Sequence, residues 1–156
     1  MGRRDRFPLL AKCLEVCTRL NHLDLSSNDF GAESLNALLS ALLKNRKHRL
    51  EVLKLGGNAI GGGGVGGAAI VASFIEFSTR ASNDKRAKLR RLDLCANSLG
   101  DGGVRTIMMG LASSPITHLY LSAGLGTVHN VVALQVEFER QILKPVFHLI
   151  GFRLWV

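Results

Sequence analysis

The chain contains 156 residues, a length that fits one domain with a hydrophobic core and is too short for two ordinary domains. Apolar residues make up 47% of the chain and charged residues 21%, so the composition excludes a wholly disordered protein and a collagen-like fibre. The formal net charge of +8 admits acidic proteins, nucleic acids or anionic membranes as partners without choosing among them.

The start of the chain and its cysteines bear on the cellular compartment. Arg3, Arg4 and Arg6 precede an apolar stretch, but Lys12 and Glu15 interrupt it before it reaches the length of a signal peptide. Three cysteines, an odd number, do not form the disulfide framework of a small secreted domain. No apolar run reaches the roughly 18 residues that span a bilayer. We expect a cytoplasmic protein, with the nucleus or a mitochondrial presequence as the alternatives.

A leucine-rich motif repeats along most of the chain. Its form is Leu-x-x-Leu-x-Leu-x-x-Asn, and copies start at Leu20, Leu50 and Leu89. A fourth copy starts at Ile116 and is degenerate, because Gly124 stands where the asparagine is expected. Because side chains alternate along a strand, the second and third leucines share one face of a short strand. The asparagine that follows can bond peptide groups in the turn.

A helical pattern follows the strand in the best copies. Apolar residues recur at three- and four-residue spacing from Leu35 to Leu43 in the first copy and from Val104 to Leu111 in the third. In the same frame, residues 1–19 are predicted to hold the helix of an incomplete repeat whose own strand is missing.

The copies start 30, 39 and 27 residues apart, and the longest interval contains a polar insertion over residues 78–88. We expect this insertion to form an exposed loop. The helix before it is apolar nearly all round, which requires a cover for Val71 and Phe74. Packing within the chain is the expected cover, with a partner as the alternative.

Residues 125–156 depart from the repeat. Val131–Leu143 can form a helix that Pro145 stops, and an apolar tail follows it. Repeat arrays normally finish in a cap with a polar outer face, and neither end of this chain has that character. The sequence therefore favours a fragment, a truncated product or a module that a partner completes.

Three segments resemble leucine-rich repeats of the ribonuclease-inhibitor type: LNHLDLSSNDFGAESLNALLSALL, LEVLKLGGNAIGGGGVGGAAI and LRRLDLCANSLGDGGVRTIMMGL. The resemblance covers residues 9–121. It implies an α/β solenoid of about four repeats over residues 20–124, with short parallel strands on a concave face and helices on a convex face. It also implies protein binding as the usual task.

The glycine-rich run after the second copy contains Gly62, Gly64 and Gly67 in the G-x-G-x-x-G spacing of a dinucleotide-binding turn. Glycine is so dense here that this spacing is nearly unavoidable. The repeat itself assigns Gly61 and Gly64 to positions that match Gly100 and Gly103. We therefore expect structural glycines and no cofactor, and a P-loop is excluded because no Gly-Lys-Ser or Gly-Lys-Thr follows.

Other chemistry finds little support. Cys13 and Cys17 have a helical spacing that could bring two thiolates to one metal, but no local residue completes the ligand set. We expect both to pack as small apolar residues against the next repeat. His22 and His118 occupy matching positions three strands apart, about 14 Å at ordinary strand spacing, so they cannot share a proton or a metal. No catalytic residue and no metal site are expected.

Charge is concentrated in the first part of the chain. Residues 1–91 contain 16 Lys or Arg and 8 Asp or Glu, whereas residues 92–156 contain 4 of each. The sequence predicts a basic edge between helix ends and the following strands, made of Lys44, Arg46, Lys47, Arg49, Lys85, Arg86 and Lys88. A solvated edge with no partner is the simpler interpretation, since cations are favoured near helix C-termini.

The strand positions that face outward form the predicted partner-binding set: His22, Asp24, Lys54, Arg90, Arg91, Asp93, His118 and Tyr120. We expect a non-enzymatic module that binds a protein partner, of acidic character where it meets the basic edge. The alternatives are a GTPase-activating-protein-like regulator of a small GTPase and a weak nucleic-acid binder. Nucleic acid is disfavoured because aromatic residues do not interleave with the charges. The oligomeric state is open.

Overall fold

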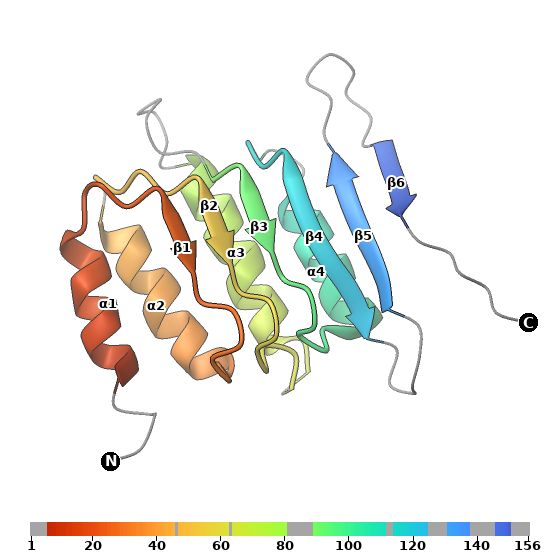
Figure 1. Cartoon of the computed structure of the whole chain (residues 1–156), viewed down its shortest axis with the longest axis horizontal. Coiled ribbons are helices and arrows are strands. Elements are labelled where there is room, and N and C mark those ends of the chain that lie inside the picture. The colour runs from red at the N-terminus through yellow and green to blue at the C-terminus, as the bar shows by residue number, and fades with distance from the viewer. Residues whose placement is uncertain are drawn as a thin grey trace, which may run out of the picture.

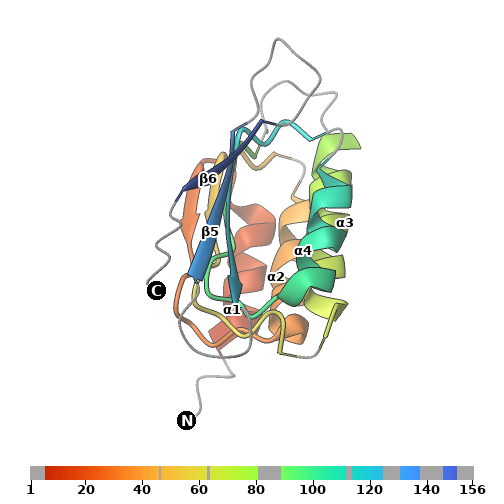
Figure 2. The same ribbon diagram turned by 90° about the vertical axis from the view of Figure 1, so that its right-hand side faces the viewer.

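The computed structural model describes residues 6–45, 47–62, 64–80, 89–111, 114–124, 131–137 and 146–150. These residues form two layers, a sheet and a row of helices that cover one face of it (Figure 1). Figure 2 shows the layers edge on, with the helices on one side of the sheet. We call the opposite side of the sheet the open face.

The described helices are α1 (Arg6–Val16), α2 (Ala32–Lys44), α3 (Gly66–Arg80) and α4 (Gly100–Gly110). Apolar periodicity explains how they pack, because Leu35, Leu38, Leu39 and Leu42 lie on one side of α2 and are all buried. The prediction of a helix within residues 1–19 is confirmed by α1.

The described strands are β1 (His22–Asp24), β2 (Val52–Lys54), β3 (Arg91–Asp93), β4 (His118–Gly124), β5 (Val131–Glu137) and β6 (Val146–Ile150), which form one sheet in chain order. β1 to β4 run parallel, and their register places Leu23, Leu53, Leu92 and Leu119 side by side. The expected stack of parallel strands is therefore confirmed. A helix lies between each of these strands and the next, so the parallel part is an α/β solenoid.

The core lies between the two layers. Leu53 and Leu92 are each 1% exposed and Leu119 is fully buried, and all three contribute to one continuous hydrophobic cluster. Val71 and Phe74 of α3 also belong to this cluster. Their predicted cover by packing within the chain is confirmed.

Buried asparagines connect successive repeats. The Asn58 side chain accepts hydrogen bonds from the backbone N–H groups of Asn28 and Phe30 in the preceding repeat, at 3.0 and 3.1 Å. Its amide nitrogen donates to the carbonyl oxygens of Leu25 and Leu55, at 3.0 and 2.7 Å. One side chain thus satisfies two donors and two acceptors that the turn removes from water.

Two expectations about the irregular parts are wrong. Residues 131–137 form strand β5 rather than a helix, and β5 pairs antiparallel with β4. β4 offers an unpaired edge that the sequence does not reveal, and the three valines of VVALQVE favour a strand once that edge is present. Residues 138–145 and 151–156 lie outside the described residues.

The predicted loop over 78–88 begins too early. Residues 78–80 belong to α3, and the Ser78 hydroxyl donates to the carbonyl oxygen of Ile75 at 2.9 Å within that helix. Residues 81–88 lie outside the described residues.

Candidate functional site

The parallel register lines up two rows of side chains on the open face. Each row takes one residue from each of β1 to β4. One row is His22, Val52, Arg91 and His118, and the other is Asp24, Lys54, Asp93 and Tyr120. Both rows point away from the helices, because they alternate with the buried leucines along each strand. All the positions predicted to bind a partner, except Arg90, therefore come together on one surface, and Arg90 lies directly before β3.

The second row is held by its own contacts. Lys54 Nζ lies 3.3 Å from Asp24 Oδ2, and the backbone N–H of Ser26 donates to Asp24 Oδ1 at 3.0 Å. The bonds from Ser26, followed by Lys54, hold the pKa of Asp24 below its ordinary value. Asp93 accepts a bond from the backbone N–H of Cys95 in the same way, at 2.9 Å. These two carboxylates are therefore already hydrogen-bonded within the chain.

The first row carries no acidic residue. Arg91 and the preceding Arg90 are both exposed, and neither makes an ion pair within the described part of the chain. Main-chain bonds fix their position, because Arg90 N and Arg91 N both donate to the carbonyl oxygen of Glu51, at 2.8 and 3.0 Å. Arg91 therefore presents an unpaired guanidinium group on the open face, and Arg90 presents a second one directly before β3.

Thr117 orients the histidine at the end of the first row. Its hydroxyl donates to the carbonyl oxygen of Arg90 at 3.2 Å and lies 2.9 Å from His118 Nδ1. The contact with the hydroxyl holds the His118 ring at the end of the row. Sequence analysis missed this role, which only the register of β3 and β4 reveals.

The described part of the basic edge consists of Lys44, Lys47 and Arg49, all of them at least partly exposed. Lys44 Nζ lies 3.0 Å from Glu15 Oε1, so this cation has an acidic neighbour. The other predicted members, Arg46, Lys85, Arg86 and Lys88, lie outside the described residues.

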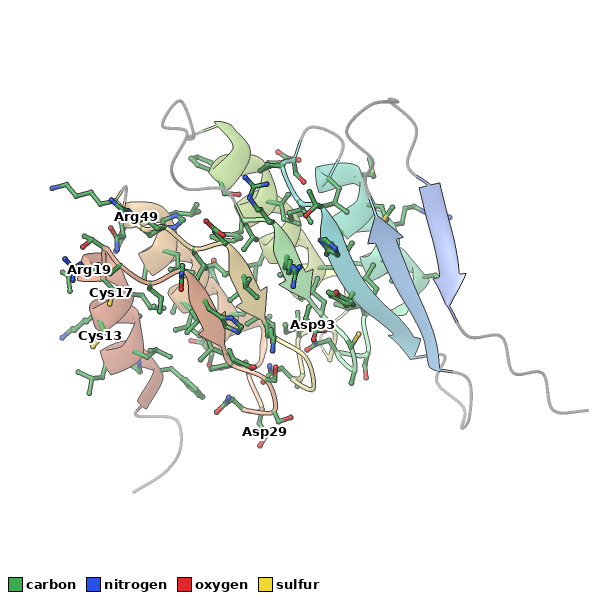
Figure 3. The ribbon with its side chains drawn as sticks, turned by 45° about the horizontal axis from the view of Figure 1, so that its top comes forward. Cys13, Cys17, Arg19, Asp29, Arg49 and Asp93 are labelled. Atoms are coloured by element: carbon green, nitrogen blue, oxygen red, sulfur yellow. The ribbon has the colours of Figure 1, made fainter. Side chains whose placement is uncertain are left out.

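Arg19 is a cation of the same edge that sequence analysis missed. It precedes Asn21 by two residues, just as Arg49 precedes Glu51, and Asn21 and Glu51 are neighbours because Glu51 N donates to Asn21 O at 2.8 Å. Figure 3 shows Arg19 and Arg49 at the same end of the strands. Register between repeats is the signal that identifies it.

The glycine-rich run serves packing between repeats. A Cβ atom at Gly61 would overlap the backbone oxygen of Ser98 in the next repeat, and one at Gly67 would overlap the backbone oxygen of Ile60. Gly64 has a φ of +88°, which favours glycine. The close approach of neighbouring backbone accounts for the glycines at positions 61 and 67, so their presence does not require a bound dinucleotide phosphate.

The expectation that Cys13 and Cys17 pack against the next repeat is wrong. Both are exposed, and Figure 3 shows Cys13 on α1 and Cys17 just after it, at one end of the molecule. The face of α1 that meets the core is formed instead by Leu10 and Leu14.

His22 and His118 lie at opposite ends of one four-strand row. The described residues contain no group of three or more His, Cys, Asp or Glu side chains suited to a metal ion.

Comparison with known proteins adds a family match. The family model for the leucine-rich repeat matches residues 16–39 and 47–67, which contain β1 and β2. A search of curated proteins finds no significant match. Among the described helices, none combines the length and the apolar character that crossing a bilayer requires. Leucine-rich repeats generally present an extended surface to protein partners. With β1 to β4 stacked in parallel and a helix between each consecutive pair, the described residues have the fold of a leucine-rich repeat solenoid of about four repeats.

Proposed function

We propose that the open face and the basic edge together bind an acidic segment of a protein partner. The observation that carries the proposal is the charge of the open face. Arg90 and Arg91 are exposed and unpaired within the described residues, whereas Asp24 and Asp93 are bonded to neighbours in the chain. A carboxylate of a partner would therefore meet guanidinium groups that have no internal competitor.

The dimensions of the face explain why the edge takes part. Four strands at ordinary spacing give a platform about 14 Å wide between the outer strand axes. A stable interface usually buries about 800 Å² on each partner, which requires more than this platform. Arg19, Lys47 and Arg49 extend the positive surface beyond the start of β1 and β2. Arg91 and Tyr120 are the anchors we expect at its centre, since Arg and Tyr are enriched among interface hot spots.

The test is affinity purification with quantitative mass spectrometry, using the full chain as bait. We expect the double variant R90E/R91E to lose its acidic partners by at least about tenfold in recovered amount, because two favourable charge contacts become repulsive. The matched control K12E/R105E reverses two exposed cations on α1 and α4 and should keep those partners. Circular dichroism should be the same for all three proteins. Equal recovery with both double variants would contradict the proposal.

The ribonuclease-inhibitor type, the cytoplasmic location and the two alternative activities stay predictions. No feature of the described residues favours GTPase regulation or nucleic-acid binding in particular. The same variants test the two alternative activities. Stimulated GTP hydrolysis by a small GTPase, or a nucleic-acid affinity that falls steeply with salt, would indicate one of them in the wild-type chain. Loss of that activity in R90E/R91E would show that it uses these two arginines.

A further inference from the structure

Charge on the open face changes sign along the direction of the strands. Arg91 stands at the start of β3, and Arg19 and Arg49 of the basic edge precede β1 and β2. Asp93 stands at the end of β3, and Asp29 follows β1 in the turn toward α2. Figure 3 shows both acidic residues toward the opposite end of the strands from Arg19 and Arg49. No Lys or Arg offsets these carboxylates in the segments that follow β1 to β3, which are residues 25–31, 55–65 and 94–99.

The carboxylates of the second row are turned toward the C-terminal ends of the strands. Asp24 Oδ1 accepts the N–H of Ser26 at 3.0 Å, and Asp93 Oδ1 accepts the N–H of Cys95 at 2.9 Å. The Asp93 carboxylate also lies beside Gly56, where a Cβ atom would be 3.4 Å from Asp93 Oδ1. Because these bonds draw both carboxylates away from the first row, they keep the negative charge apart from the arginines.

Asp93 keeps a charge that the chain does not neutralise. Lys54 is the register neighbour of Asp24 on one side and of Asp93 on the other. Its Nζ lies 3.3 Å from Asp24 Oδ2, and Asp93 makes no ion pair within the described part of the chain. The bond from Cys95 N–H fixes the Asp93 carboxylate but leaves it negative. Asp93 is therefore the counterpart, at this end, of the unpaired Arg91.

The change of sign runs across the solenoid and not along it. Figure 1 shows the strands side by side, so their direction is crosswise to the direction in which repeats stack. A repeat stacked beside β1 would widen both charged ends of the open face and cover neither. The two ends are also close together, because the five residues from Arg49 to Lys54 extend over at most about 17 Å. A single extended segment of about six residues reaches both ends.

We propose, resting on the proposed function, that the partner segment is bipolar and lies along the strands in one charge orientation. Its acidic end contacts Arg91 and the basic edge, and its basic end contacts Asp93 and Asp29. The reversed orientation brings like charges together at both ends, which costs binding free energy. The net charge of +8 favours a purely acidic ligand instead, so net charge and the bipolar face predict opposite orders of affinity.

The test compares two fluorescent peptides that bind to the full chain. The bipolar peptide contains three glutamates, four neutral residues and three lysines, and the acidic peptide has glutamines in place of the lysines. Fluorescence anisotropy at about 0.1 M salt measures both dissociation constants, because screening over about 10 Å then suppresses long-range attraction. We expect the bipolar peptide to bind at least about fivefold more tightly, since its lysines add contacts that the glutamines lack.

A double variant identifies the residues that receive the lysines. In D29N/D93N, asparagine keeps an acceptor for Cys95 N–H and tolerates the φ of +56° at position 29. We expect D29N/D93N to bind the bipolar peptide as weakly as wild type binds the acidic peptide, with no loss of affinity for the acidic peptide. The matched control E76Q/D101N removes two exposed carboxylates from α3 and α4 and should keep both wild-type affinities.

A spin label tests the orientation directly. A nitroxide at the glutamate end of the bipolar peptide should broaden the backbone amide resonances of Arg49 and Arg91 more than that of Cys95, and a nitroxide at the lysine end should do the reverse. Equal broadening from both ends would overturn the proposal. An acidic peptide that binds as tightly as the bipolar one would also overturn it and leave the proposed function standing. No binding by either peptide would overturn both.

Discussion

The first and second repeats contain the same motif but hold it differently. Asn28 and Asn58 occupy the same position, yet Asn28 is exposed and Asn58 is 7% exposed. Asn28 donates to Ser26 O within its own turn, at 2.9 Å, whereas Asn58 bonds the backbone of the preceding repeat as well as its own. The asparagine therefore acts between repeats, and its contribution to stability depends on the repeat that precedes it in the stack.

The third repeat adds a further step to this comparison. Asn97 is fully buried, and its amide nitrogen donates to the carbonyl oxygens of Leu55 and Leu94, at 2.9 and 3.0 Å. Its Oδ1 atom is buried without a hydrogen-bond partner within the described residues. Asn58 therefore makes the fuller set of bonds, and its loss should cost the most.

Removing the asparagine side chain gives the largest expected effect. We expect N58A to lower the free energy of unfolding by about 3 kcal/mol, because several buried donors and acceptors are left without partners. N28A should cost less than about 1 kcal/mol, since its side chain bonds an exposed turn. Urea unfolding followed by circular dichroism measures both. Equal losses would show that the asparagine acts within its own turn.

Glycine substitutions test the contact between the second and third repeats. We expect G61A to lower the free energy of unfolding by about 2 kcal/mol, because the added methyl group overlaps the backbone of Ser98. The control is G66A, where nothing lies within 4 Å of the new atom and where alanine should stabilise the helix by up to about 1 kcal/mol. Urea midpoints that move in the same direction for both variants would contradict the assignment of Gly61 to packing.

The smallest effect concerns His48, at the entrance to the second repeat. Burial lowers the pKa of His48 below its ordinary value of 6.5, and its Nδ1 accepts the backbone N–H of Leu50 at 3.3 Å. The unfolded chain then binds the proton more readily than the folded chain. The stability due to the neutral ring is therefore complete above about pH 6.5 and is lost as the pH falls through the lower, folded-state pKa.

Replacing the ring isolates this contribution. H48N keeps an acceptor for Leu50 N–H and removes the titrating group. We expect the free energy of unfolding to fall less steeply for H48N than for wild type between about pH 7.5 and pH 5.5. Urea unfolding at both pH values gives the two slopes. A steeper fall in the variant would contradict the direction of the pKa change.

The repeated part of the fold could be predicted because its signal is local. Leucine spacing identifies the strands, and the pairing of Leu23 with Leu53 follows from the repeat itself. Contacts between distant segments could not be predicted in this way. Asn45 closes α2, yet its amide nitrogen donates to Leu14 O and Cys17 O at the end of α1, at 2.8 and 2.7 Å. Nothing in the residues around position 45 signals that partner.

On the surface, the positions of residues could be predicted from the sequence, but the bonds of their side chains could not. Register alone places His22 and Arg91 in one row of the open face, so strand spacing was enough to find them. The bonding of Asp24 and the orientation of His118 by Thr117 required coordinates, because both depend on which atoms of neighbouring residues meet. Strand β5 was missed because its conformation depends on the free edge of β4, with which it pairs, as well as on its own valines.

The change from parallel to antiparallel pairing at β4 also constrains how such a gene can grow. A duplicated unit of residues 50–88 can be inserted among β1 to β4, because each of these strands pairs in parallel with the next one. A unit appended behind β4 would have to displace β5 from an edge it already occupies. We therefore expect such arrays to lengthen in evolution by insertion among the parallel strands, with the antiparallel strands β5 and β6 unchanged.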